Sequence, residues 1–340
     1  MQEGSGLRCS LGKHHRRDGY WKSYHLAHTR ELDAIAGGIV SLVKESKPPV
    51  QRKKTRRGRK PVHSREKLVC VCLLMIVMGY TFRDMQNYVP KLNLPWDEPY
   101  PDHSTIHRAY QEMPQGYLDA LLDRTARLCM EESGWSKGLL ASDSSGVETD
   151  RYEEVVRPNK KERRFEKVRR LFYLKYHIVA ILDHLIILRA RVTSYRANDS
   201  PVLRSMLRRF PSLPGSIFNA DRGFDAEANF KRVYELLMHP NIKQIARQKG
   251  PRGRGHKRLH NRSRAAKEFD QSLYRWRGMI EAIFGAEESD EHSLRTRFRK
   301  DENRERWGVI LAMGWNLKVL NRLRCRKMLE MEVTSIIRAN

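Results

Sequence analysis

The spacing of hydrophobic and polar residues changes along the chain near Gly134. Before that point apolar residues recur at helical spacing, in short segments that end at glycine or proline. The most apolar segment, Leu68–Met78, reads LVCVCLLMIVM and predicts a buried helix. It is about half the roughly 20 residues that cross a bilayer, so we expect no membrane contact.

The helices expected before Gly134 have recognisable starting residues. Ser64 precedes the apolar segment as an N-cap, and Thr81 is placed to start a second helix. A third helix begins at Ser104 in the sequence STIHRAYQEM. This pattern predicts a helical region of helix-turn-helix type. Ser104, Thr105 and Arg108 lie where a recognition helix contacts base edges.

After Gly134, apolar runs typical of strands alternate with helical patterns. This alternation predicts a mixed α/β domain, in which acidic residues at strand ends converge. The expected strands are 138–142, 171–183, 185–193, 216–220 and 242–246, and the expected helices are 203–210, 226–238, 265–284 and 303–323.

The charge balance is strongly basic. The 340 residues include 66 Lys and Arg against 40 Asp and Glu, a net charge of +26 with a pI near 10.1. A field of this sign attracts nucleic-acid phosphates, with anionic membrane surfaces as the rival partner. We expect a cytoplasmic, nucleoid-associated protein, because the first residues do not resemble a secretory signal. The five cysteines are scattered and predict neither a disulfide framework nor a zinc site.

Two stretches concentrate the basic residues. Residues 51–60 (QRKKTRRGRK) predict a flexible arm, in which Arg57, Arg59 and Lys60 contact DNA phosphates or insert into a minor groove, unless the arm is only a solvated linker. Residues 247–264 carry eight Lys or Arg and no acid, which predicts a basic loop.

Three acidic residues form the candidate chemical site. Asp143 follows the first expected strand and Asp221 follows the strand at 216–220. Glu281 is spaced i, i+3, i+7 with Tyr274 and Arg277, so these three residues share one face of a helix. Carboxylates at neighbouring strand ends can bind one divalent cation. Each acid also has a simpler interpretation, as a turn former or as the ion-pair partner of Arg277.

Together these residues resemble the DDE transposases of bacterial and archaeal insertion sequences. The resemblance covers most of residues 135–325 and rests on ASDSSGVETDRYE, on NADRGFD, and on a Tyr, two residues, Arg, three residues, Glu signature. It implies a ribonuclease H-like mixed sheet flanked by helices, with an N-terminal helix-turn-helix-like DNA-binding region. It also implies that Asp143, Asp221 and Glu281 bind two Mg²⁺ ions, with Mn²⁺ as a substitute.

The resemblance implies a function as well. Such a protein binds the terminal inverted repeats of double-stranded DNA, cleaves at the element ends and transfers the 3′ hydroxyl to target DNA. It works as a homo-oligomer on DNA and has no small-molecule substrate. Tyr274 and Arg277 would lie at the DNA, and two metal ions would assist the nucleophile and the leaving oxygen.

Four segments follow from this interpretation. They are an N-terminal segment with the basic arm (1–60), a helical DNA-binding domain (61–133), a catalytic domain containing the basic loop (134–325) and a C-terminal tail (326–340).

One position departs from the family signature. The family continues after Glu281 with six residues and a Lys, and Glu288 stands at that position. Either Arg295, Arg297 or another base replaces the missing contact, or substrate binding is weakened. The alternatives are therefore an inactive or domesticated DNA-binding relative, or a metal-dependent nuclease or resolvase with the same core. A basic RNA-binding protein would leave the three acids unexplained.

Neighbouring residues receive supporting interpretations. Asp225 is expected to cap the helix that follows it. Lys175 and His177 are expected either to contact DNA or to occupy ordinary surface and core positions. Gly223 would let DNA approach the backbone closely.

Overall fold

The computed structural model describes residues 20–49, 62–92, 94–96, 99–159, 164–245, 260–289 and 294–339. The predicted arm, with Arg57, Arg59 and Lys60, lies outside the described residues, as does the basic loop from 247 to 259.

The N-terminal region is helical, as the sequence predicts. It contains α1 (Tyr20–Thr29), α2 (Glu31–Ser46), α3 (Arg65–Val77), α4 (Phe82–Tyr88), the 3₁₀ turn η1 (Val89–Lys91), α5 (His103–Gln111) and α6 (Gln115–Ser133). The predicted caps of α3 and α4 are confirmed: Ser64 Oγ accepts from the Lys67 N–H, and Thr81 forms a capping box with Asp84. Helix α5 begins one residue early, because the Asp102 carboxylate accepts from the Thr105 N–H at 2.7 Å.

Helix α3 is almost wholly buried in the core. No single helix in the described ranges is long and apolar enough to cross a membrane. The pair Arg65–Val77 and Phe82–Lys91 passes that test of length and composition only when taken together, and it is bent by 113°.

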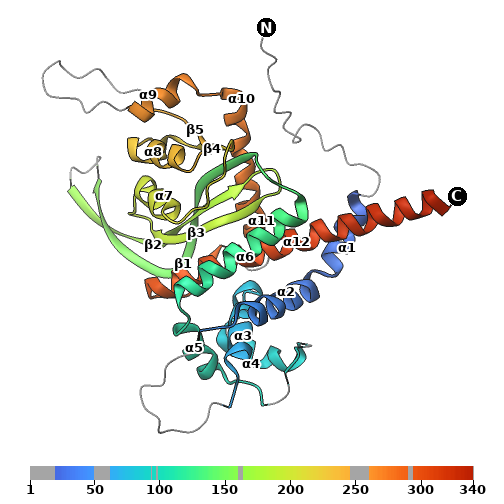
Figure 1. The fold of residues 1–340 in the computed structure, drawn as a ribbon. Helices are drawn as coiled ribbons and strands as arrows, with labels where there is room; N and C mark the ends of the chain where they lie inside the picture. Colours follow the sequence, from blue (N-terminus) through green and yellow to red (C-terminus); the bar gives the residue numbers. More distant parts are fainter. Residues whose placement is uncertain are drawn as a thin grey trace, which may run out of the picture.

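A mixed sheet forms the second half of the fold (Figure 1). Its strands are β1 (Leu139–Asn159), β2 (Arg164–Ile181), β3 (Ile186–Ser194), β4 (Ile217–Ala220), β5 (His239–Ile242) and β6 (Arg295–Thr296). The order is β3-β2-β1-β4-β5, and β6 also pairs with β1. Strands β1, β2 and β3 are antiparallel, whereas β4, β5 and β6 join in parallel. The predicted α/β class and mixed sheet with flanking helices are confirmed.

Three strand boundaries differ from the prediction. Strands β1 and β2 run far beyond 138–142 and 171–183, because their outer halves are held by cross-strand pairing and carry no apolar run. Strand β5 begins at His239 and not at Ile242. Its sequence HPNI resembles a turn, yet Pro240 is tolerated because, among the described strands, β5 is at the edge of the sheet and pairs on one side only.

The remaining helices are α7 (Asp199–Leu207), the 3₁₀ turn η2 (Arg222–Phe224), α8 (Glu227–Glu235), α9 (His260–Lys267), α10 (Gln271–Tyr274), the 3₁₀ helix η3 (Arg275–Ile280), α11 (Glu281–Ser289) and α12 (Asp301–Ala339). The single helix predicted over 265–284 is wrong. The Asp270 side chain accepts from the Ser272 and Leu273 N–H groups, and this cap starts a new helix within the predicted one.

Helix α12 connects the two halves of the molecule. Figure 1 shows it running between the sheet and the N-terminal helices. Buried Asn316 receives a hydrogen bond from the Ile187 N–H and donates one to the Ile187 carbonyl, both at 2.8 Å. Tyr110 of α5 donates to the Asn303 carbonyl at 2.7 Å. The helix passes position 325 without a break, so the expected tail continues it as far as Ala339.

The close packing of α12 against α3 predicts an effect of one substitution. A Cβ at Gly314 would lie 2.7 Å from Val77 Cγ2, so Gly314→Ala should lower the free energy of unfolding by about 1–3 kcal/mol. Gly37→Ala is the matched control in α2, because nothing lies within 4 Å of its added Cβ. Urea unfolding of both variants tests this, and equal stability of the two would contradict the packing argument.

Candidate active site

Asp143 and Asp221 lie side by side on neighbouring parallel strands. The register of β1 against β4 pairs Ser142 with Ala220, and each aspartate is the next residue in the chain. The expected end of the strand before Asp143 is wrong, because β1 continues to Asn159. Asp143 nevertheless lies level with the end of the neighbouring strand β4. Parallel strands present these positions at one edge, so the two carboxylates share a site.

Backbone N–H groups orient both carboxylates. Asp143 Oδ1 accepts from the Ser144 N–H and Asp221 Oδ1 accepts from the Gly223 N–H, each at 2.8 Å. Only 19% of the Asp143 side chain is exposed. One oxygen of each aspartate is thus fixed by the backbone, which limits the directions in which the other oxygen can point.

Arg277 lies between Asp143 and Glu281. Its Nη1 is 2.5 Å from Asp143 Oδ2, and its Nη2 is 3.6 Å from Glu281 Oε1. The Glu281 carboxylate faces outward, with 67% of the side chain exposed. The predicted single helical face is replaced by the end of α10, the 3₁₀ helix η3 and the start of α11. Arg277 nevertheless links Glu281 to the aspartates.

The electrostatics of these groups are coupled. Burial raises the pKa of the Asp143 carboxyl above its ordinary value, and the charge of Asp221 adds to the rise. The Ser144 N–H and Arg277 oppose that rise in part. Burial alone would lower the pKa of Arg277, but Asp143, Tyr274 and Asp221 raise it overall. The guanidinium is therefore the counter-charge of the aspartate pair.

The donor chemistry of the site suits a hard divalent cation. Carboxylate oxygens are the ligands that Mg²⁺ and Mn²⁺ take in proteins, and the two aspartates supply them at one edge. Within the described ranges, however, no three His, Cys, Asp or Glu side chains converge closely enough to hold an ion. Glu281 is separated from the aspartates by the guanidinium it shares with Asp143.

Glu288, which replaces the family Lys, lies beside β1. Its Oε1 is 3.5 Å from Ser145 Oγ, two residues beyond Asp143. The two arginines considered as replacements are engaged elsewhere, since Arg295 and Arg297 both pair with Asp150 farther along β1. Neither arginine therefore replaces the missing Lys in the described contacts, and the position beside Ser145 carries the negative charge of Glu288.

A further acid, Asp199, borders the site and was missed from the sequence. A Cβ placed on Gly223 would lie 3.1 Å from Asp221 Oδ1 and 3.5 Å from Asp199 Oδ2, so the two carboxylates approach each other across this glycine. Lys175 Nζ pairs with Asp199 Oδ1 at 2.9 Å. Asp199 opens helix α7 after Asn198, a position that reads as an ordinary helix start, so the sequence offers no signal for this role.

His177 is buried beside the same group. Its Nδ1 is 3.8 Å from Asp199 Oδ1, and its Nε2 is 2.8 Å from Thr193 Oγ1. Burial lowers the pKa of His177 to about 4, against the raising effect of Asp199. Of the two interpretations left open for His177, its 1% exposure supports the core position.

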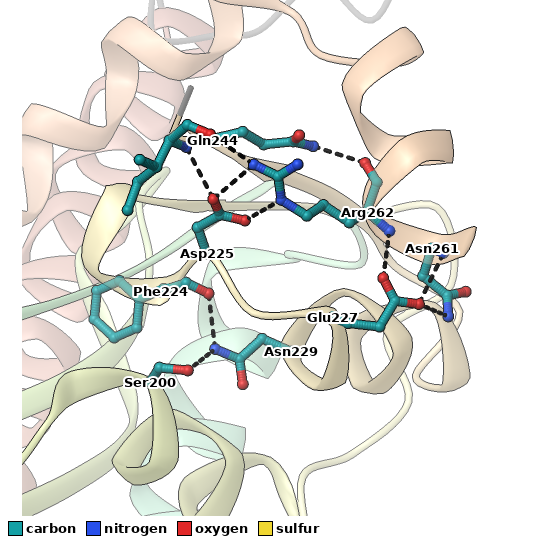
Figure 2. Close-up of polar contacts among 9 residues, drawn as sticks. Ser200, Phe224, Asp225, Glu227, Asn229, Gln244, Asn261 and Arg262 are labelled. Carbon is teal, nitrogen blue, oxygen red and sulfur yellow. Dashed lines mark hydrogen bonds and ion pairs between the residues drawn. The ribbon is translucent and has the colours of Figure 1, made fainter. Parts of the chain in front are cut away.

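The expected capping role of Asp225 is wrong. Figure 2 shows its carboxylate bound instead by Arg262, with Nε–Oδ1 at 2.7 Å and Nη2–Oδ2 at 2.9 Å. The Asp225 side chain is fully buried, and Oδ2 also accepts from the Ile245 N–H. Helix α8 begins after Ala226 without a side-chain cap. Asp225 binds the guanidinium of Arg262 and not the nearby helix N-terminus, because the guanidinium donates to both oxygens of the buried carboxylate.

The same contacts join two segments next to the site. Arg262 Nη2 also donates to the Ile245 carbonyl, Gln244 donates to the Arg262 carbonyl, and Glu227 accepts from the Asn261 and Arg262 N–H groups (Figure 2). Residues 244–245 and 261–262 are thus held together by Asp225, which lies four residues beyond Asp221. They flank the basic stretch 246–259, which is outside the described residues.

The residues expected to read DNA lie elsewhere on the molecule. Ser104 and Arg108 are exposed on α5, and Thr105 is half-buried. Ser104 Oγ donates to Asp102 Oδ1 at 2.8 Å. In Figure 1, α5 lies on the opposite side of α12 from α10. These residues remain a prediction for DNA contact.

Comparison with known proteins identifies the family. The model of the transposase DDE domain family matches residues 134–317, just over half of the chain. The chain therefore belongs to the DDE transposases, a family whose members use divalent metal ions. A search of curated proteins finds no match.

Solved structures with a match include a cryo-EM structure of the piggyBac transposase synaptic complex with hairpin DNA. The likeness covers 88% of this chain and 77% of that chain, with 10% identity and a TM-score of 0.38.

The buried Asp225–Arg262 pair predicts a large stability effect. Arg262→Ala should lower the free energy of unfolding by about 3–5 kcal/mol, because it leaves a buried carboxylate without its counter-charge. Arg264→Ala is the control: Arg264 pairs with Glu268 at the surface, where water screens the two charges, so its loss should leave the stability nearly unchanged. Chemical denaturation measures both, and a small effect of Arg262→Ala would show that the pair is dispensable.

The lowered pKa of His177 predicts loss of stability in acid. The His177 imidazole binds a proton near pH 6.5 in the unfolded chain but only near pH 4 in the folded chain. Stability is therefore full above pH 6.5 and falls below it, by about 2 kcal/mol at pH 5. Urea unfolding between pH 7.5 and 5 should show a flatter profile for His177→Gln than for wild type, whereas exposed His25→Gln should follow wild type. Parallel profiles for wild type and His177→Gln would refute this.

Proposed function

We propose that this chain binds the terminal inverted repeats of double-stranded DNA, cleaves phosphodiester bonds at the element ends and transfers the 3′ hydroxyl to target DNA. The observation that carries the proposal is the Asp143–Asp221 pair at one sheet edge, coupled to Arg277. Two adjacent carboxylates repel each other and destabilise a fold unless a bound cation offsets their charge. A site that binds a divalent metal and a phosphate supplies a reason for keeping both.

Asp143, Asp221 and Glu281 are the proposed metal ligands and catalytic residues, for two Mg²⁺ ions or for Mn²⁺ in their place. Bound metal would polarise the phosphoryl oxygens and stabilise charge on the leaving oxygen. The backbone bonds from Ser144 and Gly223 hold the aspartates in position for this task. Glu281, exposed and attached only through Arg277 in the described contacts, is the member that is free to turn toward the aspartates.

Arg277 has a second role in this proposal. A guanidinium binds phosphate oxygens in a planar, two-point manner, and Arg277 already points toward the reaction edge. With Asp143 occupied by metal, Arg277 would contact a DNA phosphate. Tyr274 is within electrostatic reach of Arg277, and its ring lies 5.4 Å from Lys243 Nζ, which places a second cation beside the proposed DNA path.

Binding of the repeats is assigned to the N-terminal part. The proposal divides the chain into an arm (1–60), a DNA-binding helical domain (61–133), a catalytic domain (134–325) and a tail (326–340). Arg57, Arg59 and Lys60 would contact phosphates from the arm. Ser104, Thr105 and Arg108 would contact base edges from α5, whose outward face is polar and basic. Two ends must be processed together, so a homo-oligomer on chromosomal DNA is expected.

One observation favours a second candidate function. Glu288 adds a negative charge beside Ser145, close to where a DNA phosphate would approach Asp143. A relative that holds DNA without cleaving it would tolerate this repulsion. A metal-dependent nuclease or resolvase with the same core would cleave but would not join ends.

The site assignment predicts the behaviour of three variants. Asp143→Asn, Asp221→Asn and Glu281→Gln should each lower the rate of metal-dependent cleavage about a thousandfold, because each removes a charged ligand. This corresponds to an activation free energy higher by about 4 kcal/mol. DNA affinity should be retained. The measurement is end cleavage and strand transfer on labelled duplex from the DNA flanking the gene, with Mg²⁺ or Mn²⁺.

Asp150→Asn is the matched control, since Asp150 lies on the same strand but pairs with Arg295. It should keep wild-type cleavage. Full cleavage activity of both Asp143→Asn and Asp221→Asn would disprove the metal site. Cleavage without joined products would indicate the nuclease, and binding without any product would indicate the inactive relative.

A further inference from the structure

Strands β1 and β2 leave the sheet together as a two-stranded ribbon. Their pairing continues from Tyr152 opposite Leu171 to Asn159 opposite Arg164. In the described part of the chain no third strand accompanies it: β6 pairs with β1 only at 148–149, and β3 pairs with β2 only up to Leu174. Eight paired positions span roughly 27 Å. Figure 1 shows the ribbon curving away from the rest of the molecule.

One face of this ribbon exposes large apolar side chains. Tyr152 and Leu171 are opposite each other, Val156 follows at even spacing along β1, and Tyr173 lies two residues from Leu171 where β2 enters the sheet. All four are exposed, Tyr152 to 59% and Val156 to 58%. An isolated two-stranded ribbon is marginally stable, and an exposed apolar stripe marks an interaction site. The ribbon therefore needs a partner.

The charges of the ribbon indicate what that partner is. Residues 151–159 and 164–173 contain six basic residues and three acidic ones, and the surplus is positive. Glu154 pairs with Lys167 at 3.8 Å, and Glu153 pairs at 3.5 Å with Arg196, which lies outside the ribbon. Arg169 stacks on Tyr152, with its guanidinium carbon 4.6 Å from the ring centre. Glu153 and Glu154 are thus ion-paired, while Lys167 and Arg169 lie beside the apolar side chains on the same face.

We propose that this ribbon docks into the major groove of duplex DNA. The groove admits a two-stranded β-ribbon, so cations on its margins meet the phosphates of both strands while Tyr152 and Val156 meet base edges. Docking of the same face onto a second copy would bring two positive surpluses together, which the charge balance disfavours.

The position of the ribbon fits the proposed cleavage site, and this part rests on the proposed function. Asp143 and Tyr152 lie on the same strand, nine residues apart, which spans roughly 30 Å. One turn of duplex DNA is about 34 Å. A duplex with its cleaved phosphate at Asp143 therefore presents its next groove near the base of the ribbon.

The test is the salt dependence of DNA binding by the triple variant Arg151→Gln, Lys167→Gln, Arg169→Gln. Each lost phosphate contact lowers the slope of log affinity against log salt by about 0.9, so the slope should fall by about 1.8–2.7. The control removes three exposed cations away from the ribbon and outside the proposed DNA-binding segments: Lys137→Gln, Arg204→Gln, Arg209→Gln. Its slope should match wild type. Equal slopes for the ribbon variant and wild type would overturn the proposal.

A second variant separates DNA from a protein partner. Tyr152→Ser, Val156→Ser should weaken duplex binding and leave the sedimentation coefficient of the free protein unchanged. A change in sedimentation with DNA affinity unchanged would overturn the proposal in favour of a second copy. Binding is measured on uncleaved duplex without metal, so its outcome is independent of whether the chain cleaves DNA. Hydroxyl-radical footprinting should show the lost protection about one helical turn from the cleaved phosphate.

Discussion

The arrangement of the molecule depends on the parallel pairing of β1 with β4. This register brings Asp143 and Asp221 to one edge, where their repulsion must be offset. Arg277 offsets it from η3, and the loss of water around these groups makes each charge felt by the others. A slip of one residue would turn every side chain of β4 to the other face of the sheet and separate the carboxylates. The chemistry and the core therefore impose the same register.

Sequence reasoning succeeded where the cause of a structure is local. The caps of α3 and α4 depend on side chains three residues from their partners, and the strand at 216–220 is a short apolar run that is buried in the sheet. It failed where the cause is distant. The ribbon halves of β1 and β2 are stabilised by each other, so neither carries a long apolar run of its own.

The site shows the same division. Asp143 and Asp221 are recognisable because each follows an apolar strand, and the backbone holds both as that position suggests. Asp199 and Arg262 are not recognisable, because their partners lie 24 and 37 residues away in the chain and become neighbours only when the sheet and its helices assemble. Asp225 was misassigned for this reason: a distant guanidinium outcompeted a nearby helix N-terminus.

Helix α12 has a consequence for how the chain is made. The Asn321 side chain donates a hydrogen bond to the carbonyl of Ala27, 294 residues earlier. The Asn303 carbonyl accepts one from the hydroxyl of Tyr110, 193 residues earlier. Contacts of such sequence separation form late. A ribosome would release the N-terminal helices well before their packing surface on α12 has been synthesised. Until then their apolar faces are open to chaperones or to aggregation, so the N-terminal helices complete their packing only once α12 has been synthesised.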